Sequence, residues 1–232
     1  KVFQSEEFKY YIFGIIGVSS IITLIIVFYQ DPNLHTSIQH PKVFGENESA
    51  IRHALFQVTS VITTTGFVSA DFTKWSFFAT GIFFALFFTG GSAGSTSGGI
   101  KVMRHIVMLK NSFLEFKKAL HPNAIIPVRY DGKAIKHTIV LNIISFFIIY
   151  MLIFIMASVT LTLLGLDFET ALGAAASSLG NIGPAIGKVS PVDSFAHLSA
   201  GAKWFCSFLM LIGRLELFTV LILFTPFFWR KN

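Results

Sequence analysis

Charged residues are scarce in this sequence. Asp, Glu, Lys and Arg together make up 13% of its 232 residues, whereas soluble domains carry about 25%. Phenylalanine is abundant instead, with 27 residues, and the mean hydropathy is +0.68. This composition excludes an ordinary soluble domain and predicts a protein embedded in a lipid bilayer. The net charge of +6 therefore gives no reason to expect a nucleic-acid partner.

Cysteine is nearly absent, and the residue sets of common enzymes are missing. Cys206 is the single cysteine and lies in an apolar run, so no intrachain disulfide can form. The seven histidines show no metal-binding spacing. No Ser/His/Asp set, carboxylate pair or Walker motif occupies a plausible site. We therefore expect a protein that is not an enzyme and that has no covalently bound cofactor.

One glycine-rich stretch organises the chain. Residues 90–99 read Gly-Gly-Ser-Ala-Gly-Ser-Thr-Ser-Gly-Gly, without charge, and follow the apolar run 77–88. Non-helical backbone survives at membrane depth only where it is buried in protein or lines a watery cavity. The stretch, hereafter the Gly/Ser loop, is therefore predicted to lie on a pathway through the membrane. A phosphate-binding loop of a membrane enzyme is an alternative use of such a sequence.

The hydropathy pattern repeats once along the chain. A run of about 20 apolar residues, enough to cross a bilayer, precedes a short helix, a loop containing glycine and a second apolar segment. We expect Trp75, at the start of the second apolar segment of the first repeat, to be an interfacial anchor. The predicted elements are spans at 10–29 and 138–164, short helices at 51–62 and 168–179, and second segments at 75–89 continuing into 100–120, and at 204–228.

These elements predict an all-α membrane protein. It would contain two span–pore-helix–span repeats with re-entrant filter loops, at residues 1–120 and 137–232, joined by a cytoplasmic connector at 121–136. Of the 18 Lys and Arg residues, twelve fall on the side of the connector and five on the other. Because basic residues accumulate in cytoplasmic loops, both filter loops would enter from the outside.

The loops after the two short helices have the composition of a cation filter. Such a filter replaces the water around an ion with backbone carbonyl oxygens, and glycine adopts the required conformations at low cost. The preceding helices would direct their partly negative C-terminal ends at the ion. Ordinary turns between helices are the alternative. The candidate ion-binding residues are Thr63, Thr64, Thr65, Gly66, Gly180, Asn181, Ile182 and Gly183.

Arg214 lies inside an apolar segment, where a charge is costly and usually faces a cavity or a partner. It could pair with Glu216, but residues two apart do not share a helix face. It could donate to carbonyls of the Gly/Ser loop and brace it, which we favour. It could also be an electrostatic barrier below the filter, or form a buried ion pair elsewhere.

The sequence resembles the Trk/Ktr/HKT superfamily of potassium transporters, in particular its bacterial Trk potassium-uptake membrane subunits, over essentially its whole length. The resemblance rests on the motifs Thr-Thr-Thr-Gly-Phe at 63–67, the Gly/Ser loop with Ile-Lys at 90–101, His-Pro-Asn-Ala at 121–124, Gly-Asn-Ile-Gly-Pro at 180–184 and Gly-Arg at 213–214. The second filter motif departs from the family's Thr-x-Gly.

The resemblance implies a fold and a function. The chain would be the C-terminal half, repeats three and four, of a four-repeat potassium-channel-like pore in the bacterial inner membrane, a plasma membrane that it crosses several times. The first half would belong to a longer chain, which we favour, or two copies would assemble. Potassium would bind at the filter carbonyls and pass either passively, as in an ion channel, or coupled to an ion gradient, as in a symporter.

The resemblance also implies a gate and partners. The gate would consist of Gly90, Gly91, Ser92, Ala93, Gly94, Ser95, Thr96, Ser97, Gly98 and Gly99 with Arg214. The protein would be a homodimer, and a cytosolic nucleotide-binding regulatory subunit would dock at 101–136. A non-transporting membrane scaffold and a membrane enzyme are the alternative functions.

Overall fold

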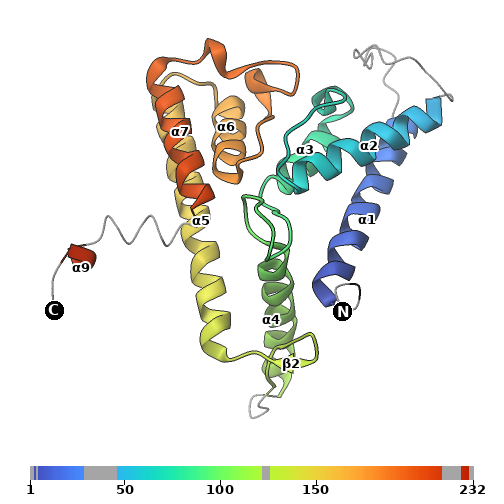
Figure 1. Ribbon diagram of the computed structural model, residues 1–232, viewed down its shortest axis with the longest axis vertical. Helices are drawn as coiled ribbons and strands as arrows, with labels where there is room; N and C mark the ends of the chain where they lie inside the picture. The colour runs from blue at the N-terminus through green and yellow to red at the C-terminus, as the bar shows by residue number, and fades with distance from the viewer. Residues whose placement is uncertain (1–2, 4, 29–45, 122–125, 216–225, 230–232) are drawn as a thin grey trace.

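The computed structural model describes residues 3, 5–28, 46–121, 126–215 and 226–229. These residues are largely helical, as the composition predicts, with one two-stranded hairpin in addition (Figure 1). The elements in chain order are α1 (Glu6–Phe28), α2 (Glu46–Ile62), the 3-10 turn η2 (Phe72–Lys74), α3 (Phe77–Leu86), α4 (Val102–Leu120), β1 (Arg129–Tyr130), β2 (Lys133–Ala134), α5 (His137–Leu163), α6 (Phe168–Gly180), the 3-10 turns η3 (Gly187–Val189) and η4 (Phe195–His197), α7 (Ala200–Arg214) and α9 (Pro226–Trp229).

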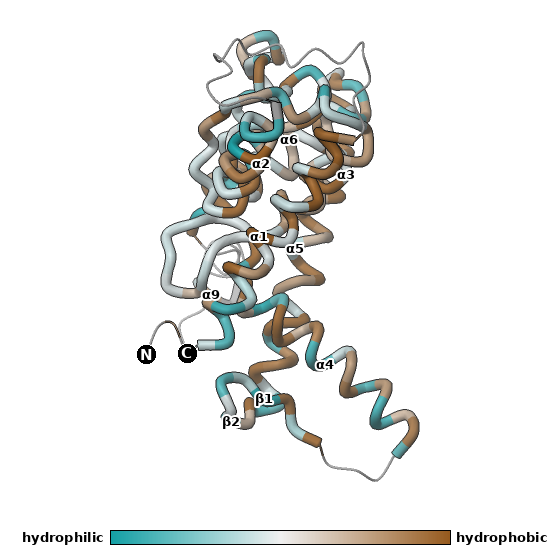
Figure 2. The backbone as a smooth tube through the Cα atoms, turned by 90° about the vertical axis from the view of Figure 1, so that its right-hand side faces the viewer, coloured by the Kyte–Doolittle hydropathy of each residue, from teal (hydrophilic) through white to brown (hydrophobic). Residues whose placement is uncertain are grey.

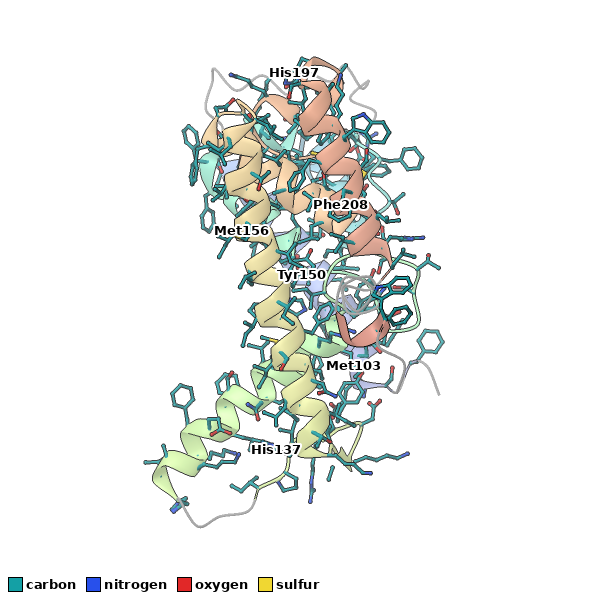
Figure 3. The ribbon with its side chains drawn as sticks, turned by 90° about the vertical axis from the view of Figure 1, so that its left-hand side faces the viewer. Met103, His137, Tyr150, Met156, His197 and Phe208 are labelled. Atoms are coloured by element: carbon teal, nitrogen blue, oxygen red, sulfur yellow. The ribbon has the colours of Figure 1, made fainter. Side chains whose placement is uncertain are left out.

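Two described helices, α1 and α5, are long and apolar enough to cross a bilayer. They lie on opposite sides of the molecule (Figure 1), and α5 is hydrophobic along most of its length (Figure 2). The helix α5 extends from His137 at one end of the molecule past Tyr150 and Met156 (Figure 3). Three of its hydroxyl groups are satisfied within the helix, because Ser158, Thr160 and Thr162 each donate to the carbonyl four residues earlier. The helix can therefore lie in an apolar environment without unpaired hydroxyls at these positions.

In the first repeat, the second apolar segment, predicted at 75–89 and 100–120, is interrupted by the Gly/Ser loop. The helix α3 has 10 residues, and α4 begins at Val102 rather than at Ile100 because the backbone pairs there. Ile100 forms a parallel bridge with Thr89, and the Gly90 N–H donates to the Ile100 carbonyl at 2.8 Å. The Gly/Ser loop thus leaves and returns at one point, between two half-helices.

In the second repeat, the second apolar segment begins before Trp204. The helix α7 starts at Ala200 because Ser199 caps it, its hydroxyl accepting from the Ala202 N–H at 3.3 Å. It ends at Arg214, so the remainder of the span predicted at 204–228 lies mostly outside the described residues, as does Glu216.

The expectation that Trp75 is an interfacial anchor is wrong. Its side chain is only 5% exposed. The ring packs 5.8 Å from that of Phe83, which stacks on Phe72 at 4.3 Å. Trp75 therefore belongs to the apolar core under α3, whereas Trp204 is 79% exposed.

Small residues bring α6 into the centre of its half of the molecule. Ala171, Ala174, Ala175 and Ala176 are all buried, and α6 packs against both α5 and α7. Small side chains allow the backbones of neighbouring helices to approach closely in membrane proteins. The C-terminal end of α6 is thereby fixed at the level just above the Gly/Ser loop, where α2 also ends (Figure 1).

The predicted connector contains a hairpin that the sequence analysis missed. Strands β1 and β2 pair antiparallel around Asp131 and Gly132, both with positive φ, at 49° and 75°. Asp-Gly is a favoured pair for a two-residue hairpin turn. The hairpin lies beside α4 at the end of the molecule opposite α6 (Figure 1).

Candidate functional site

The first candidate filter loop begins as a specific helix ending of α2. Thr64 adopts the left-handed conformation with φ of 53°, and its N–H donates to the Val61 carbonyl at 3.0 Å. The Thr65 N–H donates to the Ser60 carbonyl at 2.9 Å. This pair of bonds, around a left-handed residue, is the Schellman motif. It turns the chain back at Gly66, whose φ is also positive at 77°.

The second loop repeats this geometry at the end of α6. Asn181 has a φ of 55° and donates from its N–H to the Ser178 carbonyl at 3.2 Å. The Ile182 N–H donates to the Ser177 carbonyl at 3.0 Å, and Gly183 follows with a φ of 113°. The two loops therefore match residue for residue, although one reads Thr-Thr-Gly and the other Asn-Ile-Gly.

A serine behind each loop holds the returning chain. The Ser60 hydroxyl donates to the Phe67 carbonyl at 2.7 Å, and the Ser177 hydroxyl accepts from the Gly183 N–H at 3.1 Å. Among the described residues, none donates a hydrogen bond to the carbonyl oxygens of 63–66 or 180–183. Buried or semi-buried main-chain carbonyls are normally paired, so these oxygens are available to another ligand.

The two loops meet at a glycine. A Cβ added to Gly66 would lie 2.2 Å from the Ile182 carbonyl oxygen and 3.6 Å from Pro184. Such closeness is impossible for any residue with a side chain unless the backbone moves. A carbonyl of the second loop is thus pressed against the backbone of the first, so the two loops are in direct contact.

The Gly/Ser loop lies directly against these loops. The Gly98 N–H donates to the Thr64 hydroxyl at 3.1 Å. A Cβ on Gly98 would lie 2.2 Å from the Gly180 carbonyl oxygen. Glycine at position 98 is therefore required by the close approach of the Gly/Ser loop to both filter loops.

Two basic side chains hold consecutive carbonyls of the Gly/Ser loop. Lys101 Nζ donates to the Ser95 carbonyl at 2.9 Å and also to the Ser97 carbonyl. Arg214 Nη1 donates to the Thr96 carbonyl between them. The hydrogen bond from Arg214 is the bracing contact that the sequence analysis favoured. The contact from Lys101 was missed, although its place immediately after the loop lets a long side chain fold back over it.

The position of Arg214 follows from how α7 is attached to the second filter loop. Asn181 Nδ2 donates to the Met210 carbonyl at 3.1 Å. A Cβ on Gly213 would lie 2.0 Å from the Leu179 carbonyl oxygen. Gly213 thus allows α7 to touch the end of α6, and the next residue reaches the Gly/Ser loop.

A basic cavity of about 270 Å³ lies beneath the loop. Lys101, Arg104 and Arg214 line it, and the Arg104 guanidinium lies 3.7 Å from the centre of the Phe146 ring. Three cationic groups around one cavity raise its electrostatic potential and oppose the presence of a cation. The same residues can therefore brace the loop and form an electrostatic barrier.

The hydrogen bonds of the Gly/Ser loop argue against the phosphate-binding alternative. A phosphate loop needs several N–H groups pointing at the anion. In this loop the N–H groups of 90, 91, 93, 95 and 98 all donate to other groups of the protein. Half of the ten N–H groups of the loop are therefore already engaged within the protein.

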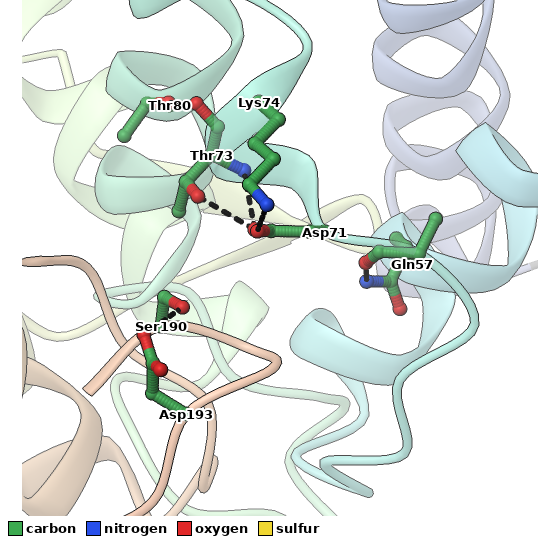
Figure 4. A network of polar contacts seen from close by, with 8 residues as sticks. Gln57, Asp71, Thr73, Lys74, Thr80, Ser190 and Asp193 are labelled. Atoms are coloured by element: carbon green, nitrogen blue, oxygen red, sulfur yellow. Dashed lines mark hydrogen bonds and ion pairs between the residues drawn. The ribbon is translucent and has the colours of Figure 1, made fainter. Parts of the chain in front are cut away.

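A buried glutamine holds the segment that returns from the first loop, and sequence reasoning gave no sign of it. Gln57 is 1% exposed. Its Nε2 donates to the Ala70 carbonyl at 2.5 Å, and its Oε1 accepts from the Ser69 N–H at 3.4 Å. Asp71, which follows Ala70, accepts hydrogen bonds from the Thr73 N–H and hydroxyl and caps the start of η2 (Figure 4). These bonds fix the returning end of the loop.

No acidic or imidazole metal site competes with these carbonyls in the part of the chain that is described. No three His, Cys, Asp or Glu residues there are close enough to hold a metal ion. The unpaired carbonyls at the meeting point of the two loops are consequently the best candidate ligands for a cation.

Comparisons with known proteins identify the relatives of this chain. The model of the TrkH family, described as a cation transport protein, matches residues 9–231. The Trk system potassium uptake protein TrkH of Halomonas elongata is 40% identical over 186 residues, which are 80% of this chain and 38% of that protein. The Trk system potassium uptake protein TrkH of Escherichia coli K12 is 37% identical over 189 residues, 82% of this chain and 39% of that one.

A solved structure is similar over almost the whole chain. The crystal structure of the potassium transporter TrkH from Vibrio parahaemolyticus has a TM-score of 0.87 and 33% sequence identity, and the match covers 99% of this chain and 46% of that one. The chain therefore spans less than half the length of these relatives.

Proposed function

Because the chain belongs to the TrkH family of cation transport proteins and is therefore a membrane protein, we propose that it supplies half of a potassium-permeation pathway across the bacterial inner membrane. The proposal rests on one observation above all. The carbonyls of 63–66 and 180–183 have no donor among the described residues, and the two loops that carry them are in contact where the Ile182 carbonyl faces Gly66.

Potassium would bind at this point. Backbone carbonyls can replace the hydration shell of a potassium ion, and the C-terminal ends of α2 and α6 add partial negative charge. The two span–pore-helix–span repeats would be the third and fourth of a four-repeat pore. Two further loops of the same kind would complete the ring around the ion.

The Gly/Ser loop would close the pathway on the cytoplasmic side of the filter. It lies against both filter loops through Gly98 and is held by Lys101 and Arg214. Opening then requires these hydrogen bonds to break or to move together with the loop. The basic cavity would further disfavour a cation while the loop is closed.

Partners and coupling complete the proposal. We expect a homodimer, and a cytosolic nucleotide-binding regulatory subunit docked at 101–136, where Lys117 of α4 and Arg129 and Lys133 of the hairpin are exposed. Permeation would be passive or coupled to an ion gradient.

Rubidium-86 uptake into proteoliposomes holding the full-length parent protein tests this function. The regulatory partner and its nucleotide are supplied, and folding is checked by size-exclusion chromatography. We expect uptake that unlabelled potassium blocks and sodium does not. Folded protein that shows no uptake would overturn the proposal in favour of a non-transporting scaffold.

A further inference from the structure

The first turn of α1 touches the Gly/Ser loop across a long sequence separation. Glu7 Oε1 accepts a hydrogen bond from the Ala93 N–H at 2.5 Å. This contact complements the two basic braces, because they hold carbonyl oxygens of the loop whereas Glu7 holds an N–H group. A carboxylate that accepts from a backbone N–H forms a charge-assisted bond, about twice as strong as a neutral one.

The same turn of α1 is bound to the hairpin. The Glu6 N–H donates to Asp131 Oδ1 in the hairpin turn at 2.6 Å. Lys110 on α4 pairs with the Glu6 carboxylate and also donates to the Arg129 carbonyl at 3.0 Å. The hairpin, α4 and the start of α1 are thus tied together at one end of the molecule.

Glu7 lies at the junction between this tied unit and the loop. Its second oxygen, Oε2, accepts from the Tyr130 hydroxyl over a longer distance of 3.4 Å. Burial raises the pKa of Tyr130 well above its ordinary value, and the nearby Glu7 and Asp131 carboxylates raise it further. The phenol therefore keeps its proton and remains a donor at any physiological pH.

We propose that Glu7 is a positioning residue that couples the cytoplasmic hairpin to the Gly/Ser loop. One carboxylate oxygen faces each of them, so a displacement of the hairpin is transmitted to the Ala93 N–H. Hydrogen bonds of this length weaken steeply when the atoms separate by about 1 Å. Movement of the hairpin by a docked regulatory partner would thus release one brace of the closed loop. The inference rests on the proposed gating function of that loop.

Loop exposure tests the coupling independently of transport. A labelling site is placed at Ser92→Cys, in the full-length parent with Cys206→Ser and any other accessible cysteine replaced. Ser92 precedes Ala93 and is partly buried with the loop in place, so its thiol reacts faster when the loop moves, and cysteine is close to serine in size. The rate of reaction with a membrane-impermeant maleimide from the cytoplasmic side then reports how often the loop opens. Rubidium-86 uptake is measured in parallel without the labelling site.

Glu7→Gln keeps the shape of the side chain and removes its charge. We expect labelling and uptake to rise by about tenfold, which corresponds to about 1.4 kcal/mol. Tyr130→Phe should give a rise of about twofold, because its contact is longer. The matched controls are Glu48→Gln, whose carboxylate pairs with Arg52 on the surface of α2, and Tyr10→Phe, which is 54% exposed. Both controls should behave as the parent.

Two outcomes separate the coupling from the proposed function. If Glu7→Gln is labelled no faster than Glu48→Gln, Glu7 does not position the loop and the inference is wrong. If the parent shows no uptake but the labelling rates still differ as expected, the transport proposal fails and the coupling stands. If Glu7→Gln does not fold, the labelling rates of Tyr130→Phe and Tyr10→Phe are compared instead. Equal rates would likewise show that the inference is wrong.

Discussion

The Gly66→Ala substitution, which adds one carbon atom, should damage the proposed filter. In Gly66→Ala the new Cβ would lie 2.2 Å from the Ile182 carbonyl oxygen. Carbon and oxygen normally approach to about 3.3 Å, so the carbonyl must move by about 1 Å. A non-glycine residue at this φ of 77° also costs about 1–2 kcal/mol. Because the displaced oxygen is one of the proposed ion ligands, selectivity should fall together with flux.

Two other glycines separate backbone strain from the clash. Gly183 has a φ of 113°, but a Cβ there would meet only Gly66 Cα at 3.8 Å. Gly183→Ala therefore suffers strain without displacing a carbonyl of the other loop. Gly81 lies in α3 with no atom within 4 Å of a new Cβ, so Gly81→Ala should be neutral or stabilising by up to about 1 kcal/mol.

Rubidium-86 uptake with potassium or sodium as competitor measures all three variants in the full-length protein. We expect Gly66→Ala to lose most of its uptake or its preference for potassium, Gly183→Ala to be affected less, and Gly81→Ala to match the parent. If folded Gly66→Ala shows parental flux and preference, the contact between the loops does not shape an ion site, and the filter interpretation is refuted.

Further predictions concern the Gly/Ser loop. Arg214→Ala, which removes the hydrogen bond to Thr96, should raise basal uptake by about fivefold and leave the potassium preference unchanged; a change in preference would instead assign Arg214 to the filter. Deletion of 92–97 should raise flux strongly in the same assay, and unchanged flux would contradict a gating role. Lys101→Met, which keeps the apolar stem but loses two loop contacts, should raise flux at least as much as Arg214→Ala, and a fall in flux would show that Lys101 supports the open state.

Hydropathy was sufficient to predict the main helices. The runs that became α1 and α5 are long and nearly free of charge, so the bilayer thickness decides their length. The short helices α2 and α6 were predicted because they are too short to span and end at glycine-containing turns. The bracing by Arg214 was predicted from the cost of a charge in an apolar segment.

Other features depend on tertiary contacts that no local pattern encodes. The burial of Trp75 results from aromatic neighbours on η2 and α3, and the bond between Glu7 and Ala93 joins residues far apart in the chain. The hairpin was a different kind of omission. Its Asp-Gly turn is visible in the sequence, but each flanking strand has only two residues, too few to show the alternating pattern of a strand.

Anomalous scattering from bound rubidium is the most direct test of the central claim, because it locates the ion itself. Crystals of the full-length protein are grown in rubidium and, separately, in sodium. We predict a rubidium peak between the carbonyl oxygens of 63–66 and those of 180–183, near the contact of Gly66 with Ile182, which sodium does not reproduce. A transport-competent protein with no rubidium at this point, or with the ion elsewhere along the chain, would contradict the account.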